Sequence, residues 1–307
     1  MKKIMFLFLL SVFITVTAVF QIVVSNTPPL NSGAFLVDNI LLGNGINASA
    51  TTFTGAPDQI AFFNGANSNV GIDSGIILTS GNIFDVVGPN NSGSTSEDWY
   101  WTGYGDGDAT LDQFVFPDLT NDAAVLEFDF VPTSNLISFK YVFASEEYLE
   151  YVNAGFNDVF GFFLTGPNPN GGNYINENIA VLPGTNTIVS IDNVNDIANS
   201  AYFINNGSGS SSPQNNDPTV ISFDGFTTPL TASADVICGV TYHIKLAVAD
   251  VGDGIYDSGV FLEGGSFYSP NLAVDDDLNI DSVVMEIPCG STITLTADVG
   301  SPLATYE

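Results

Sequence analysis

Alternating hydrophobic and polar positions are the clearest pattern in the chain, and they predict β-strands. Phe139, Tyr141 and Phe143 occupy every second position of one run, which is the period of a strand with one buried face. Residues 125–131 and 241–249 alternate in the same way. Long runs with the 3.6-residue period of a helix are missing, so the pattern predicts an all-β fold.

Turn residues divide these runs into short strands. The strands at residues 125–131 and 136–143 are separated by four residues that begin with proline, and we predict that they form a hairpin. Acidic residues of the first strand would then share an outer face with Lys140, which gives a modest cross-strand attraction. Many short strands joined by turns rich in Gly, Asn, Asp and Ser predict a jelly-roll-like β-sandwich over residues 26–269.

The two ends of the chain predict processing and a further domain. Residues 1–25 contain two lysines followed by an apolar run, the pattern of a secretory signal peptide, with cleavage expected after Ala18 or Ser25. If it were not cleaved, this run would be long enough to span a bilayer. We interpret residues 270–282 as a linker and residues 283–307 as the truncated start of a small Ig-like β domain, in a piece of a longer protein.

Composition and charge limit the possible partners. Hydrophobic residues make up 45% of the chain and aromatic residues 12%, which is ample for a core. Without the leader, 34 carboxylates face two lysines and no arginine, a net charge of about −32. Nucleic acid and anionic membrane surfaces are excluded as partners, because binding either requires clustered cations. Bound divalent cations or a salty medium would relieve the self-repulsion.

Two acidic clusters follow predicted strands. The first contains Glu146, Glu147, Glu150 and Asp158, and the second contains Asp250, Asp253 and Asp257. Carboxylates interleaved with glycines can converge on one point, which suits the six to eight oxygen ligands of calcium. If the two preceding strands end side by side, both clusters contribute to one calcium site, with Glu146, Glu147, Asp158, Asp250, Asp253 and Asp257 as metal ligands. Otherwise these carboxylates are solvated or cap helices.

Aromatic residues in a polar loop are candidates for ligand binding. Trp99, Trp101 and Tyr104 lie within the Gly- and Ser-rich residues 90–107. Such side chains either close the end of a sandwich or form a stacking surface for a sugar. The expected ligand is an extracellular glycan or a surface protein, and the oligomeric state stays open.

Candidate catalytic groups are few. His243 is the single histidine and is predicted on the outer face of a strand, which argues against a serine triad and against histidine-based zinc or iron sites. A glycoside hydrolase is the alternative, if the fold makes Glu146 and Asp250 flank one linkage. Cys238 and Cys289 are the two cysteines. Export would permit them to pair, but Cys289 could equally pair beyond the end of this sequence.

Several segments resemble one family, the choice-of-anchor L domain. They are Tyr141-Val-Phe-Ala-Ser-Glu-Glu-Tyr148, Asn157-Asp-Val-Phe-Gly-Phe-Phe-Leu164, and residues 71–81 and 245–262. The resemblance covers roughly residues 30 to 268. It implies an extracellular module of Bacteroidetes-type bacteria that precedes varied anchoring or sorting tails, has no assigned catalytic activity, and is often exported by type IX secretion.

From these observations we predict a non-enzymatic module, secreted or on the outer cell surface after signal-peptide export. Calcium would stabilise it, and it would contribute to adhesion, carbohydrate contact or matrix assembly. The alternatives are a polysaccharide-acting glycoside hydrolase on the same sandwich and a purely structural spacer.

Overall fold

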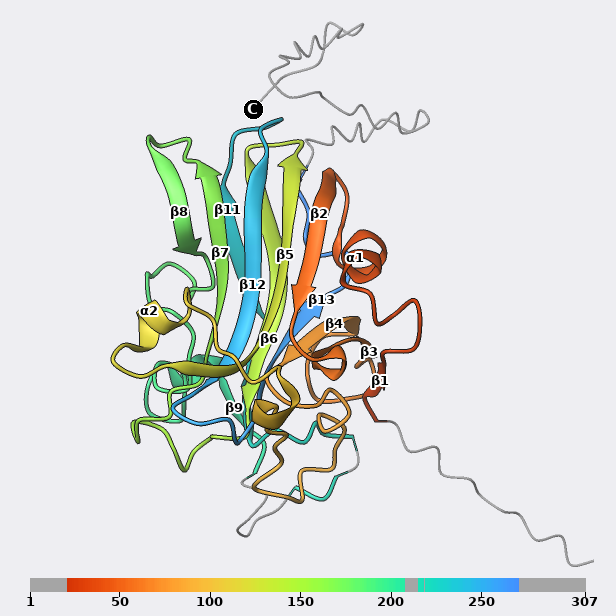
Figure 1. Cartoon of the computed structure of the whole chain (residues 1–307), viewed down its shortest axis with the longest axis vertical. Coiled ribbons are helices and arrows are strands. Elements are labelled where there is room, and N and C mark those ends of the chain that lie inside the picture. Colours follow the sequence, from red (N-terminus) through yellow and green to blue (C-terminus); the bar gives the residue numbers. More distant parts are fainter. Residues whose placement is uncertain (1–20, 208–214, 218, 271–307) are drawn as a thin grey trace, which may run out of the picture.

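The computed structural model describes residues 21–207, 215–217 and 219–270, which form two antiparallel sheets packed face to face (Figure 1). In spatial order, the larger sheet consists of β1 (Val23–Ser25), β3 (Ile60–Asn64), β4 (Ser74–Thr79), β13 (Ser258–Glu263), β6 (Leu136–Ser145), β10 (Gly225–Thr227) and β9 (Phe203–Asn205), with β11 (Leu230–Asp235) also paired to β6. The smaller sheet consists of β2 (Ile46–Thr54), β5 (Thr120–Pro132), β12 (Tyr242–Val251), β7 (Val159–Pro167) and β8 (Asn173–Asn178). The predicted all-β sandwich is confirmed.

Helical segments are short and lie in the connections. They are α1 (Gly33–Leu36), the π-helical turn η1 (Val37–Leu41), the 3-10 turns η2 (Pro57–Gln59), η3 (Tyr100–Thr102) and η4 (Ser200–Tyr202), and α2 (Asp112–Val115). No helix in the described part of the chain is long and apolar enough to cross a membrane.

Aromatic side chains fill the space between the two sheets. Phe139, Tyr141 and Phe143 of β6 are fully buried, as their alternation predicts. They meet β7 of the opposite sheet, where Phe143 stacks on Phe160 with ring centroids 4.9 Å apart and Tyr141 meets Phe162 edge-on at 4.9 Å. Each such aromatic pair contributes about 0.5–1.5 kcal/mol beyond the burial of its area.

The predicted hairpin between residues 125–131 and 136–143 is wrong. β5 pairs with β2 and β12, whereas β6 pairs with β13, β10 and β11. The residues between β5 and β6 therefore cross from the smaller to the larger sheet. Both strands have an apolar inner face, and they bury these faces by opposing each other across the core. Lys140 consequently pairs with Glu263 of β13, at 3.1 Å, instead of with the acids of β5.

The outer face of the larger sheet is also covered. Val142 and Ala144, which alternate with the core aromatics of β6, are buried in a second apolar cluster. Their partners in this cluster include Val86, Ile221 and Phe223 from two long connections. This packing brings the segments around Asp85 and Asp224 against the end of β6.

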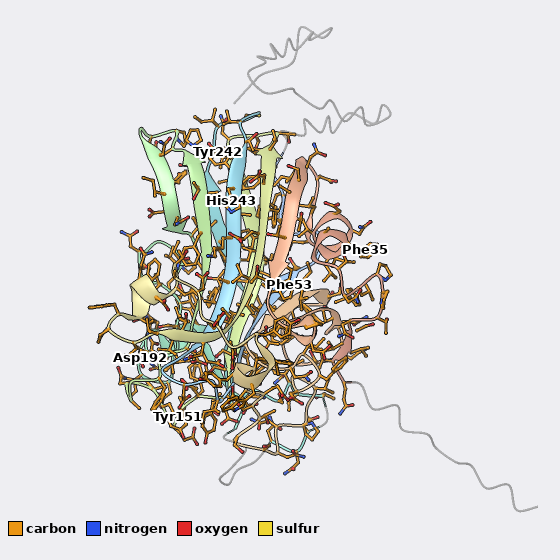
Figure 2. All side chains as sticks on the ribbon, in the orientation of Figure 1. Phe35, Phe53, Tyr151, Asp192, Tyr242 and His243 are labelled. Carbon is orange, nitrogen blue, oxygen red and sulfur yellow. The ribbon has the colours of Figure 1, made fainter. Side chains whose placement is uncertain are left out.

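Two connections cross between the sheets at the same end of the sandwich. Residues 146–158 lead from β6 to β7, and residues 252–257 lead from β12 to β13. Because β7 pairs with β12 and β13 pairs with β6, the four strand ends meet. Tyr151, in the first connection, lies at the opposite end of the molecule from Tyr242 at the start of β12 (Figure 2).

The boundaries of the fold bear on the predicted processing. β1 pairs with β3 through Val23–Ser25, so cleavage after Ala18 would keep this strand and cleavage after Ser25 would remove it. The rest of the predicted leader and residues 271–307, with the predicted second domain, lie outside the described residues. Cys238 is disulfide-bonded, and Cys289 lies outside the described residues.

Candidate functional site

Carboxylates from both crossing connections gather at this end of the sandwich. We define the acid cluster as the six predicted metal ligands, Glu146, Glu147, Asp158, Asp250, Asp253 and Asp257. Five of them are at most 3% exposed, and Asp253 is half-buried. Glu150, by contrast, is exposed. The two stretches, about a hundred positions apart, are thus brought together in the interior and not on a solvated surface.

Hydrogen bonds fix the two connections to each other. The Asp158 carboxylate accepts one from the backbone N–H of Val251 at 3.0 Å and one from the Ser258 hydroxyl at 2.6 Å. The backbone N–H of Glu146 donates to the carbonyl of Asp257 at 3.0 Å. The start of β7, the end of β12 and the start of β13 are therefore joined through polar contacts.

Several carboxylate oxygens in the acid cluster are buried without a partner. Both oxygens of Asp250, both of Glu146 and Oε2 of Glu147 accept no hydrogen bond from the described residues. For Asp250 this holds although the Ser80 hydroxyl and the Asp158 carboxyl lie beside it. A buried charge without a partner costs several kcal/mol or more.

Among the described residues, no basic side chain neutralises this charge. Of the described residues, Lys140 and Lys245 are the two lysines, and both pair elsewhere. Lys140 contacts Glu263, and Lys245 contacts Asp108 on the outer face of the smaller sheet. A proton or a bound cation therefore has to balance the acid cluster.

Burial, reinforced by neighbouring acids, raises the pKa of these groups. The pKa of Asp158 rises to about 8, and desolvation with the nearby charges of Asp158 and Asp253 raises the pKa of Glu147 to about 11. For Asp250 and Glu146 the pKa also lies well above the ordinary range, again chiefly because of desolvation. In the metal-free state these groups hold protons at neutral pH.

Three further acids adjoin the acid cluster, and they were missed by the sequence analysis. Desolvation raises the pKa of Asp122 to about 7, and it also raises the pKa of Asp85. Asp224 adds to the negative charge around Glu146. The pairing of β5 with β12, which sets Asn121 opposite Asp250, would have revealed Asp122. The other two depend on how long connections pack.

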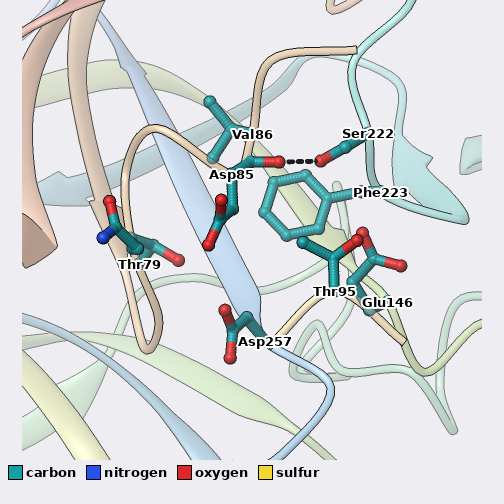
Figure 3. A pocket seen from close by; sticks show the side chains of 9 residues that line it. Thr79, Asp85, Val86, Thr95, Glu146, Ser222, Phe223 and Asp257 are labelled. Atoms are coloured by element: carbon teal, nitrogen blue, oxygen red, sulfur yellow. Dashed lines mark hydrogen bonds between the residues drawn. The ribbon is translucent and has the colours of Figure 1, made fainter. Parts of the chain in front are cut away.

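A narrow pocket opens between some of these acids, with a volume of about 170 Å³ that includes the part open to solvent (Figure 3). Asp85, Glu146 and Asp257 line it with Thr79 and Thr95. The space between the facing side chains is too narrow to enclose a water molecule.

The donor set limits how a metal could bind. In the described part of the chain, no three Asp, Glu, His or Cys side chains converge closely enough to share one metal ion as they stand. Calcium, however, also accepts backbone carbonyls and water among its six to eight ligands. Asp158 and Asp250, which adjoin each other, could supply two carboxylates, and Glu147, from the same connection as Asp158, lies near Asp158.

Residues 90–107, which we call the aromatic loop, lie beside the acid cluster. Its backbone is held by acids, because the N–H of Glu97 donates to the Asp257 carboxylate at 3.2 Å. The indole of Trp99 is half-buried and donates to the Ser80 carbonyl at 2.9 Å, so it anchors the loop. Trp101 and Tyr104 point outward, with exposures of 88% and 43%.

The side chains that could act in catalysis either lie away from the acid cluster or are buried within it. His243 lies on the outer face of the smaller sheet, as predicted, between Asp129 at 2.8 Å and Glu127 at 3.4 Å. Glu146 and Asp250, the pair that a glycoside hydrolase would use, are buried. Neither carboxylate is accessible to a polysaccharide in this conformation.

Comparison with known protein families identifies a match over most of the chain. The model of the choice-of-anchor L domain matches residues 24–268. No curated protein or solved structure is significantly similar to the chain. The matched region begins within β1, ends after β13 and includes the whole acid cluster. The chain therefore belongs to the choice-of-anchor L domain family, which comprises surface-associated modules and is not a known enzyme family.

Proposed function

We propose that this chain is an exported, non-catalytic surface module whose acid cluster binds calcium. The carrying observation is the set of buried oxygens of Asp250 and Glu146 that have no hydrogen-bond partner among the described residues, in a group of acids without a lysine. A hard divalent cation would neutralise these carboxylates and supply the missing ligands. The export route, by signal peptide and type IX secretion, belongs to the same proposal.

Calcium would act as a clamp between the sheets. Asp158 directly precedes β7, Asp250 lies near the end of β12, and Glu147 follows β6. An ion shared by these carboxylates would join both crossing connections. A ligand present at 100 times its Kd stabilises a fold by about 2.7 kcal/mol if it binds the folded state alone.

The clamp would also order the surface that meets a partner. Asp257 and Asp122 accept hydrogen bonds from the backbone of the aromatic loop, so a cation that holds these acids in place would hold the loop. Trp101 and Tyr104 would then face a glycan or a surface protein in adhesion, carbohydrate contact or matrix assembly. Their exposure favours a binding module over a structural spacer.

Thermal unfolding of the full chain with calcium and then with chelator tests the proposal. Calcium should raise the unfolding midpoint, and Asp250→Asn and Glu147→Gln should each remove most of that rise. In chelator, both variants should be at least as stable as the unaltered protein, because each removes a buried acid. Glu177→Gln, in the exposed part of β8, is the matched control and should keep the full rise. An unchanged calcium response in Asp250→Asn and Glu147→Gln would refute the proposal.

A further inference from the structure

A second polar cleft lies on the outer face of the smaller sheet. Its volume is about 540 Å³, including the part open to solvent. Residues of β2, β5 and β12 form its floor, and residues 103–108 form one wall. It shares no residue with the acid cluster, so the two sites can be tested separately.

The wall of this cleft is fixed to the sheet. The backbone N–H of Asp122 donates to the Gly105 carbonyl at 3.2 Å, and that of Ala123 donates to the Asp106 carbonyl at 3.1 Å. Gly107 lies so close to Thr120 that an added Cβ would come within 1.9 Å of its carbonyl oxygen. The cleft is therefore pre-formed, which lowers the ordering cost of binding.

The lining combines an aromatic face with hydrogen-bonding groups of both kinds. Tyr104 is partly exposed at the rim, and Asp106 and Glu127 bring carboxylate acceptors. Lys245 brings an ammonium donor, which is paired with Asp108 and with Thr110 Oγ1 at 3.2 Å. These groups can meet a ligand that carries both donors and acceptors.

The chemistry of the lining selects among ligand classes. Hydroxyl groups donate to carboxylates and accept from an ammonium group, and a sugar ring has an apolar face that can lie on an aromatic ring. An anionic sugar would be repelled by a chain with a net charge of −30. A cationic ligand would meet Lys245 in the cleft. A neutral, hydroxyl-rich ligand avoids both of these unfavourable charge interactions.

We propose that this cleft binds a neutral saccharide, with Tyr104 against the sugar ring and Asp106 and Glu127 accepting hydrogen bonds from its hydroxyl groups. The assignment rests on the proposed role as an extracellular binding module and names its ligand class.

A glycan array tests the assignment. It carries neutral, anionic and amino-sugar oligosaccharides and is probed with the full chain in the presence of calcium. Calorimetry then measures the affinity for the best neutral ligand. Tyr104→Ala and Asp106→Asn should each weaken binding at least tenfold, or about 1.4 kcal/mol. Tyr104→Phe keeps the ring and Glu177→Gln lies elsewhere, so both should bind like the unaltered chain.

Three results would overturn it: no binding to any neutral glycan, preferred binding to charged glycans, or neutral binding that Tyr104→Ala and Asp106→Asn leave unchanged. The calcium-induced rise of the unfolding midpoint is measured on the same proteins. Tyr104→Ala should keep that rise, because Tyr104 lies outside the acid cluster. Loss of saccharide binding with an intact calcium response, or the reverse, shows which of the two proposals fails.

Discussion

Asp158 accepts a hydrogen bond from the Ser258 hydroxyl at 2.6 Å, although the two residues are 100 positions apart in the sequence. Both are fully buried. Asp158 directly precedes β7 and Ser258 begins β13, so each lies where a connection between the sheets ends. The contact therefore reports directly on whether the two connections meet.

Ser258→Ala should destabilise the fold by about 1–3 kcal/mol, because it leaves one buried oxygen of Asp158 without its donor. Urea unfolding of the full chain measures the change. Ser233→Ala, at an exposed position of β11, is the matched control and should change stability by less than about 0.5 kcal/mol. Equal effects of the two substitutions would argue that the Asp158 contact does not form.

In the metal-free protein, stability should fall as the pH rises from about 5 to 8. The pKa values of Asp158 and Glu147 rise on folding, to about 8 and about 11. Above the lower pKa values of the unfolded chain, the native state holds more protons than the unfolded state, so a rise in pH favours unfolding. The loss from Asp158 runs from its unfolded pKa up to about pH 8.

Unfolding midpoints at several pH values, after removal of metal and again with calcium, check this dependence. Calcium should replace the protons, so its stabilising effect should grow with pH. Glu147→Gln should flatten the metal-free profile, which separates the effect of this group from that of the overall negative charge. A metal-free midpoint that rises between pH 5 and 8 would contradict the assignment of raised pKa values.

Gln59 makes a separate, testable contribution beside the acid cluster. It is fully buried, and its amide donates to the carbonyls of Ser80 and Asp122 at 2.5 and 2.7 Å while accepting from the N–H of Ala56 at 2.6 Å. Gln59→Leu would leave these backbone groups unpaired and should cost about 2 kcal/mol or more. Denaturant unfolding measures this cost, with the exposed Gln113→Leu as control. A cost below about 0.5 kcal/mol would mean that water replaces the amide.

The inner faces of the strands could be predicted from the sequence, but their pairing could not. The alternation of Phe139, Tyr141 and Phe143 identifies the buried face, because side chains of a strand alternate strictly. Pairing depends on contacts far apart in the chain, and the short turn after residue 132 favoured a hairpin that does not form. Val142 and Ala144 fall on the opposite face of the same strand, which is buried because two distant connections cover it.

The acids that gather at this end of the sandwich could also be predicted only in part from the sequence. Glu147 and Asp253 each follow a strong strand pattern, and the ends of those strands meet because the two connections cross between the sheets in opposite directions. Asp85 and Asp122 lack such a local signal. Their approach to the acid cluster follows from sheet order and loop packing, which a single sequence does not encode in a readable local pattern.

The most direct test of the calcium proposal is a crystal structure of the full chain grown with calcium, with anomalous data from a crystal in which terbium replaces it. We predict an anomalous peak about 2.3–2.6 Å from carboxylate oxygens of Asp158 and Asp250, and its loss in Asp250→Asn. The contradicting result is an acid cluster without a peak, in which the carboxyl groups of Asp158 and Asp250 instead share protons through hydrogen bonds to each other.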